Sequence, residues 1–486
     1  MSRSRSWAAA AITAVLVTAL ALITLPRADR LDDHRLDGRN QADGIDSTTA
    51  AIEPPPLPFR SRSLEGGPSG ADEDATRLTA EDEAVARLLD RRARAVLDRD
   101  EQAFLSTVDP AANPEFRRSE RNLFRNLADV PLDEWSYRLV RSSASMPPAD
   151  VRPAGADAVA APEVELRYAL SGVDEADIGK PMAFLFVRRG TQWYVNSDTV
   201  LEPQGRRTWR GPWSFGPSVV LRVRSGLVLG HPENAALTRR VADELDDAVR
   251  SVGEVWGTDW SRQVVVLLPS SAEEFHAQAG HAFSLTDIAA LAVADTVDTT
   301  AGVATGQRVV VNPTAAARLS DTALRVVLRH EVTHVAARSR TAPGAPMWLL
   351  EGFADYVGYR DSGLSSRQIA PELHELMSGA PDVDLRRPAA EPGGGSGSAS
   401  VPPLPADGEF HEGGRRLDLA YQTSWSLIDF LATRYGEAAV VDMYRRLAIR
   451  GEATDDEVDR VLRSEFGLGR AALLAQWRRA VADDFG

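Results

Sequence analysis

The sequence predicts an α+β fold, and three observations lead to this prediction. Apolar residues at helical spacing from Ala84 to Val96 come before strand-like runs that extend to residue 195. Strand-like and helical segments then alternate between residues 218 and 339, and residues 417 to 483 show helical patterns only. Because each pattern has its own period, we expect a small α+β domain followed by a domain with a mixed sheet and a mostly helical C-terminal half.

Composition limits the chemistry available to this chain. Its 486 residues, 43% of them hydrophobic, suffice for two or three domains of about 150 residues each. A formal charge of −15 disfavours nucleic acid as a partner. The chain has no cysteine, which excludes disulfides, thiol nucleophiles and thiolate zinc sites. Any metal site must therefore use His, Asp or Glu.

Residues 1–26 predict a membrane helix. The run from residue 7 to residue 25 has no charge, and Arg3 and Arg5 precede it. A helix of that length rises about 28 Å, close to the roughly 30 Å thickness of a bilayer core. The two arginines favour a cytoplasmic N-terminus, which predicts a single-pass protein of the cell membrane with extracytoplasmic domains. A signal peptide cleaved within Ala19-Leu20-Ala21, and a secreted product, is the alternative.

Residues 27–78 predict a disordered linker. They are rich in Asp, Ser, Gly and Pro, include PPPLP at 54–58, and show no sustained apolar period. Such a tether lets folded domains work above a membrane surface.

Residues 79–200 are expected to form the small α+β domain. A helix at 84–96 and a second at 115–128 precede strands at 135–140 and 164–170 and a hairpin at 182–195 that turns at RRGTQ. Helices followed by an antiparallel sheet resemble the cone-shaped nuclear transport factor 2-like fold. Such cones often hold a ligand pocket, but no charged constellation converges here. We therefore interpret this part as an accessory domain that acts as a spacer or presents substrate.

Residues 201–486 predict the larger domain, with a flexible insertion at 379–409 that contains GGGSGS and PPLP. This insertion is either a lid over a cleft or an inert surface loop. The expected strands are 218–223, 226–230, 263–269 and 308–313, and the expected helices are 235–255, a short one near Phe275, 319–339, 347–360, 417–435, 437–449, 454–465 and 470–483.

The most informative motif is His330-Glu331-Val332-Thr333-His334, an HExxH sequence on the helix expected at 319–339. Residues four apart on a helix lie on one face, so the two imidazoles can converge on one cation. Glu331 lies about 100° around the helix, where it can reach a water at the cation without becoming a ligand. The motif therefore predicts a metal site with a general base beside it.

A second carboxylate follows on the next expected helix, where Glu351 stands 17 residues after His334. The sequence pattern W-L-x-E-G-x-A-x-Y at 348–356 resembles that of the gluzincin metallopeptidases, and within them that of the peptidase MA-like family. This resemblance implies a zincin-like fold, Zn²⁺ as cofactor, and His330, His334 and Glu351 as its ligands. It implies that Asp355 accepts a hydrogen bond from a ligand imidazole. The spacing to Glu351 is shorter than in thermolysin-like enzymes.

The resemblance also implies a reaction. Glu331 would take a proton from a metal-activated water that attacks a peptide carbonyl. Tyr421 is the candidate donor to the developing oxyanion, and His411 is the alternative. The strand RVVVNP before the metal helix resembles the edge strand that pairs with extended peptide substrates.

The sequence therefore predicts a membrane-tethered or secreted zinc peptidase that acts on peptide or protein substrates. The alternative is a cell-surface binding or scaffold protein that keeps the fold without turnover, and a non-peptide amide is a further possible substrate. Nothing in the sequence indicates the oligomeric state, the substrate or the site of cleavage.

Overall fold

A computed structural model describes residues 79–141, 151–280, 288–379, 401–411 and 413–485. The expected membrane helix at 1–26 and the linker at 27–78 lie outside these residues, as does most of the insertion expected at 379–409. Within the described residues, no helix is both long enough and apolar enough to cross a membrane. Residues 401–409 are described, and Asp407 begins a short 3-10 helix there, η8 (Asp407–His411).

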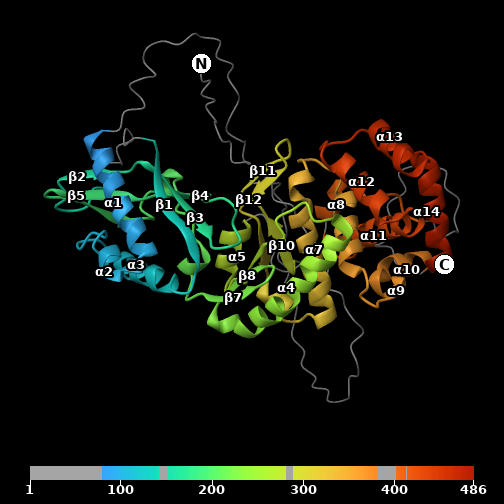
Figure 1. The fold of residues 1–486 in the computed structure, drawn as a ribbon, viewed down its shortest axis with the longest axis horizontal. Helices are drawn as coiled ribbons and strands as arrows, with labels where there is room; N and C mark the ends of the chain where they lie inside the picture. The colour runs from blue at the N-terminus through green and yellow to red at the C-terminus, as the bar shows by residue number, and fades with distance from the viewer. Residues whose placement is uncertain (1–78, 142–150, 281–287, 380–400, 412, 486) are drawn as a thin grey trace, which may run out of the picture. The chain divides into compact units, whose positions relative to one another are not determined.

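The N-terminal part of the described chain places helices before strands, as expected from the sequence (Figure 1). Asn113 accepts from the backbone of Glu115 at 2.8 Å and so caps α3, which begins with Pro114. The expected run at 182–195 contains the predicted hairpin, which turns at Gly190. The helices are α1 (Ala80–Leu97), α2 (Glu101–Leu105) and α3 (Pro114–Asn126); the strands are β1 (Leu132–Arg141), β2 (Ala158–Ala160), β3 (Glu163–Leu170), β4 (Ile178–Met182), β5 (Leu185–Arg189) and β6 (Gln192–Ser197).

These strands form two small antiparallel sheets. One has the order β1-β3-β4 and the other the order β2-β5-β6. Aromatic rings extend the core of the first sheet into the following chain, since Trp135 and Tyr168 lie 5.5 and 5.4 Å from the ring of Trp213. One buried apolar cluster thereby continues from these strands into the rest of the described chain. The core does not stop at the domain boundary expected near residue 200.

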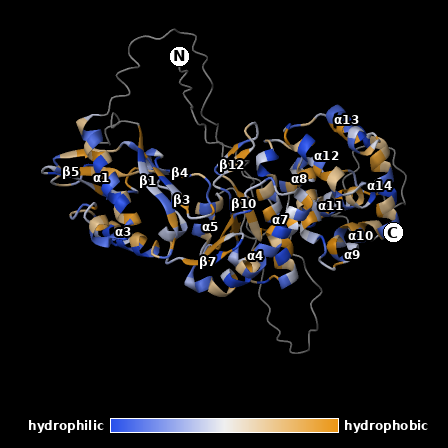
Figure 2. Cartoon of the chain, viewed as in Figure 1, coloured by the Kyte–Doolittle hydropathy of each residue, from blue (hydrophilic) through white to orange (hydrophobic). Residues whose placement is uncertain are grey.

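A mixed five-stranded sheet follows, with the order β10-β13-β9-β8-β7. Strands β8, β9 and β13 run parallel, while β7 and β10 are antiparallel to their neighbours. All residues of the parallel strands are buried, as expected for strands covered on both faces. Figure 2 shows hydrophobic colour on strands and helices in the middle of the described chain. The strands are β7 (Val219–Val223), β8 (Gly226–Gly230), β9 (Val264–Leu267), β10 (Ala290–Val293) and β13 (Arg308–Val311).

The sheet corrects one expectation. The run RVVVNP was expected to be an edge strand, but β13 has a strand on each side, and β10 is the strand at that end of the sheet. Strand β10 was not predicted, because its sequence ALAV is short and rich in alanine, which has low strand propensity. A small hairpin, β11 (Thr296–Asp298) and β12 (Val303–Thr305), connects β10 to β13.

Helices make up the remainder, and the long ones follow the predicted ranges. Ser320 caps the metal-motif helix by accepting from the backbone of Ala323 at 3.2 Å. The helices are α4 (Ala235–Trp256), α5 (Ala272–Ala279), α6 (Pro313–Ala316), α7 (Asp321–Ala337), α8 (Met347–Tyr359), α9 (Ser366–Ile369), α10 (Pro371–Met377), α11 (Arg415–Tyr435), α12 (Glu437–Ala448), α13 (Asp455–Phe466) and α14 (Arg470–Phe485).

A buried ion pair joins the end of β8 to α5. His231 and Glu274 are each 1% exposed, and His231 Nε2 lies 2.9 Å from Glu274 Oε1. The other ring nitrogen, Nδ1, lies 3.0 Å from the carbonyl oxygen of Pro217. Because a carbonyl oxygen and a carboxylate oxygen can only accept, both ring nitrogens must donate. An imidazolium form of His231 satisfies both acceptors, in agreement with the upward shift of its pKa.

This pair makes folding stability depend on pH. Burial lowers the pKa of His231, but the hydrogen bond and charge of Glu274 outweigh it and leave the pKa above its usual value. Stabilisation is therefore complete below the unfolded pKa of about 6.5 and is lost as pH rises through the folded pKa. We expect urea unfolding of the wild type and His231→Gln to differ most near pH 5.5 and least at high pH. A difference that stays constant with pH would contradict the assignment of charge.

Candidate metal centre

Helix α7 carries the first two candidate ligands. His330 and His334 lie one turn apart on a buried face of this helix, 0% and 3% exposed. Their Nε2 atoms are 3.1 Å apart. Leu324, Val327 and Val335, among other apolar residues of this helix, are buried. Burial of α7 therefore fixes two imidazoles that point at one place.

Helix α8 brings the third candidate ligand to the same place. Glu351 Oε2 lies 3.3 Å from His330 Nε2 and 3.5 Å from His334 Nε2. The ligand atoms of these three residues all lie within 4.8 Å of one another. Among the described residues, this is the group of His, Asp and Glu side chains that could hold a metal ion. The structure thus places together the three residues that the sequence selected.

The environment of Glu351 shows that these residues fit a cation. The side chain is fully buried, and in the described part of the chain neither carboxylate oxygen has a hydrogen-bond partner. Burying a carboxylate without hydrogen bonds is costly, and a bound cation removes that cost. Burial alone raises the pKa of Glu351, but the nearby His334 and His330 lower it below its usual value. The carboxylate is therefore ionised and ready to accept a divalent ion.

Asp355 orients the first imidazole. It lies one turn after Glu351 on α8, is 3% exposed, and its Oδ1 is 2.8 Å from His330 Nδ1. A carboxylate accepts here, so Nδ1 carries a proton and Nε2 is the ring nitrogen directed at the ligand cluster. Burial lowers the pKa of His330, but the hydrogen bond to Asp355 and the charges around it raise it well above 6.5. A bound metal ion would favour the neutral imidazole of His330, because the ion competes with a proton for Nε2.

The other sequence candidates are Glu331, Tyr421 and His411. Glu331 is buried beside His330 and contributes to the rise in its pKa. Tyr421 is on α11, 4% exposed, with its ring 5.3 Å from that of Phe410. His411 ends η8 and is exposed. Neither Tyr421 nor His411 belongs to the group of candidate metal ligands.

Two glycines set the position of α8: Gly352, which belongs to the W-L-x-E-G-x-A-x-Y pattern, and Gly358, which no sequence pattern singled out. A Cβ on Gly352 would lie 2.7 Å from the carbonyl oxygen of Ser424 on α11. A Cβ on Gly358 would lie 3.0 Å from the carbonyl oxygen of Val326 on α7. The helix that carries Glu351 therefore fits between α7 and α11 only because both positions lack a side chain. A glycine within a strongly apolar helix is the signal that could have revealed this.

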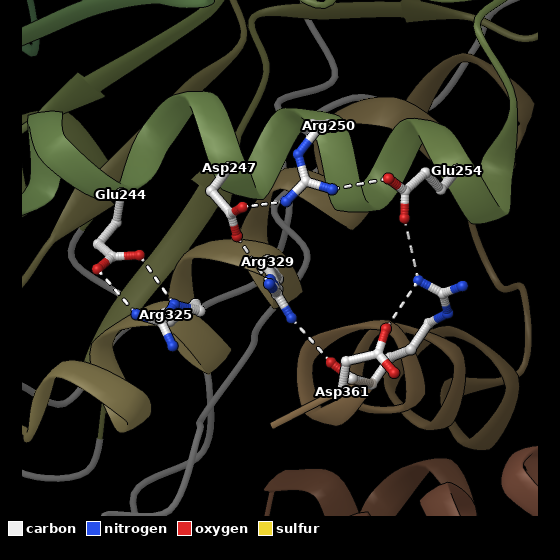
Figure 3. A network of polar contacts seen from close by, with 8 residues as sticks. Glu244, Asp247, Arg250, Glu254, Arg325, Arg329 and Asp361 are labelled. Atoms are coloured by element: carbon white, nitrogen blue, oxygen red, sulfur yellow. Dashed lines mark hydrogen bonds and ion pairs between the residues drawn. The ribbon is translucent and has the colours of Figure 1, made fainter. Parts of the chain in front are cut away.

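A network of charged residues fastens the outer side of α7, as Figure 3 shows. Arg329, next to His330, donates to Asp247 of α4 at 2.7 Å and to the carbonyl oxygen of Arg360, just after α8, at 2.8 Å. One turn earlier, Arg325 pairs with Glu244 through two hydrogen bonds of 2.9 and 3.1 Å. These contacts resist rotation of α7 about its axis, and such a rotation would move both histidines.

Comparisons with known proteins add no family to this geometry. No protein-family model matches the chain, and no curated protein matches it. The structure shows that the buried side chains of His330, His334 and Glu351 could hold a metal ion. Two of them belong to the HExxH motif, and the third is the glutamate that follows on the next helix.

The close packing at Gly352 leads to a stability prediction. We expect Gly352→Ala to lower the free energy of unfolding by about 1–3 kcal/mol, because the new methyl group must displace the backbone of α11. The matched control is Gly253→Ala in α4, where a Cβ would meet nothing within 4 Å. This control should be neutral or stabilising by up to about 1 kcal/mol. Urea unfolding of both variants checks the difference, and equal effects would refute the packing argument.

Proposed function

We propose that this protein is a zinc-dependent peptidase of the gluzincin type, similar to the peptidase MA-like family. The observation that carries the proposal is the buried carboxylate of Glu351, which has no hydrogen-bond partner among the described residues and faces two imidazole Nε2 atoms. Two imidazoles and one carboxylate are a ligand set that zinc uses in catalytic sites, where a fourth position stays open. A purely structural zinc site would be closed by a fourth side chain, and the ligand group contains three.

Each residue has a role in the proposed reaction. His330, His334 and Glu351 would hold the ion, and Asp355 keeps His330 in the tautomer that leaves Nε2 available. When bound, zinc supplies Lewis acidity toward a carbonyl and lowers the pKa of water. Glu331 would accept a proton from the attacking water and return it to the leaving amine. Tyr421 remains our candidate to donate a hydrogen bond to the substrate oxyanion.

The sheet suggests where an extended peptide would bind. Strand β10 pairs with β13 on one side and ends the described sheet on the other. Main-chain groups on that free side could add a substrate strand. We therefore assign substrate pairing to β10, in place of the run RVVVNP at 308–313.

We also propose that the protein is tethered to the cell membrane with its folded part outside the cytoplasm. The support is the uncharged run at residues 7–25, preceded by two arginines. Secretion after signal cleavage remains the alternative.

Metal analysis tests the site itself. We expect about one zinc ion per chain in the wild type and loss of that zinc in both His334→Ala and Glu351→Ala, since each variant removes one of three ligands. Elemental analysis of the purified proteins measures this, and zinc should raise the melting temperature of the wild type alone. Zinc retained in both variants would place the ion elsewhere.

Turnover tests the peptidase. We expect Glu331→Gln to lower cleavage of labelled casein and of a quenched fluorescent peptide library by about a hundredfold or more, with zinc still bound. A matched change at an exposed glutamate of α5, Glu273→Gln, should leave turnover unaltered. If the wild type binds zinc and cleaves no peptide, the scaffold alternative replaces the peptidase.

A further inference from the structure

Two ion pairs connect the β1-β3-β4 sheet to the five-stranded sheet near the candidate metal centre. Asp174, between β3 and β4, pairs with Arg308, the first residue of β13. Lys180 of β4 pairs with Asp295, which follows β10. We call these four residues the clamp. Lys180 is the only lysine of the chain, so the position is chemically unique.

The Arg308–Asp174 pair has the geometry of a fixed contact. Both terminal nitrogens of Arg308 bind the two carboxylate oxygens of Asp174 at 2.8 Å, and the two side chains are 8% and 6% exposed. This two-point contact fixes orientation as well as distance. Trp209 covers the pairs on one side: its ring stacks on Tyr168 at 5.4 Å and lies 5.1 Å from Lys180 Nζ. The Arg308–Asp174 pair is therefore largely shielded from water, while Asp295 is partly exposed.

The clamp holds the end of the strand to which we assign substrate pairing. Val293, the last residue of β10, is paired with Arg308, so both ion pairs act at this end of the β10/β13 ladder. The backbone nitrogen of Asp295 also donates to Thr305 at 3.0 Å. Gly306 has a φ of +64°, and a Cβ there would collide with the Asp295 carboxylate. The chain on both sides of the β11–β12 hairpin is thus tied to the clamp.

The same hairpin reaches the end of the metal helix. Both its strands pack on η6 (Arg338–Arg340), which directly continues α7. The hairpin therefore lies between the clamp and the helix that carries His330 and His334. Movement at the clamp would change the position of β10 relative to these two residues.

We propose that the clamp is a positioning device: the N-terminal sheet fixes β10 and the β11–β12 hairpin in the register at which an extended peptide reaches the metal centre. This assignment rests on the proposed peptidase function. It gives the N-terminal part a task beyond that of a spacer. The four clamp residues act through β10 and are not themselves in contact with the candidate ligands.

Energetics favour positioning over stability as the role of the clamp. Buried ion pairs lose as much by desolvation as they gain by attraction, so replacing both partners can be nearly neutral for folding. Removing one partner leaves a buried charge and is strongly destabilising. The informative variant is therefore the double change Asp174→Asn with Arg308→Gln. Lys180→Gln is a second, independent variant, since its partner Asp295 is 28% exposed and can be hydrated.

The experiment compares these variants with the wild type in the full-length, zinc-loaded protein. The control is Asp109→Asn with Arg189→Gln, a two-point pair within the N-terminal part that does not reach the five-stranded sheet. Three readouts apply: hydrogen exchange of the β10 amides, affinity for a peptidyl hydroxamate that would span metal and strand, and affinity for acetohydroxamate, which would contact the metal only. Labelling of Lys180 by an amine-reactive ester reports opening of the clamp in the double variant and the control.

We expect both clamp variants to exchange β10 amides about tenfold faster and to bind the peptidyl hydroxamate about tenfold more weakly. Zinc content and acetohydroxamate affinity should stay within about twofold of the wild type, and the control should match the wild type throughout. Unchanged β10 exchange in both clamp variants would overturn the proposal. If the wild type binds no hydroxamate, the peptidase function fails instead, while exchange still decides whether the clamp holds β10.

Discussion

The buried carboxylate of Glu351, held against two imidazoles, is the constraint on which the rest of the structure depends. An ionised group without hydrogen bonds in a dry interior is unfavourable unless a cation balances it. The surrounding fold keeps this arrangement by burying most of α7 and α8. Burying the Glu351 carboxylate therefore lowers the stability of the metal-free protein locally. Sites that are preorganised for a ligand often carry such a cost, whereas an ordinary hydrophobic core does not.

The geometry of that point is maintained by very close helix contacts. Gly352 and Gly358 allow α8 to approach the backbones of α11 and α7, and Glu351 and Asp355 are placed by the same helix. On the opposite side, Arg329 joins α7 to α4 and to the end of α8. Contacts to the backbone and to fixed charges leave little freedom of rotation. A ligand set with separations near 3.3 Å requires that rigidity.

The mixed sheet relates the metal centre to the N-terminal part of the chain. Strand β10 is antiparallel to β13 and is the last strand of the described sheet on this side. The hairpin that follows β10 packs on η6. The clamp then ties this end to the β1-β3-β4 sheet through buried charges. A continuous apolar core supports the same connection. The β1-β3-β4 sheet therefore shares both a core and two ion pairs with the five-stranded sheet.

The sequence by itself predicted the long helices, three of the buried strands and the histidine pair, because helical period, apolar runs and i,i+4 spacing are local properties. Glu351 as the third candidate ligand came from the resemblance to the gluzincins. The sequence could not place β10, whose alanine-rich residues form a strand only through pairing with β13, and it therefore assigned the edge of the sheet wrongly. Tertiary structure alone decided which of the two imidazoles Asp355 contacts, that Gly352 touches α11, and that Asp174 meets Arg308 from 134 residues away. Contacts between segments distant in sequence depend on how all intervening elements pack, and local sequence patterns do not determine this packing.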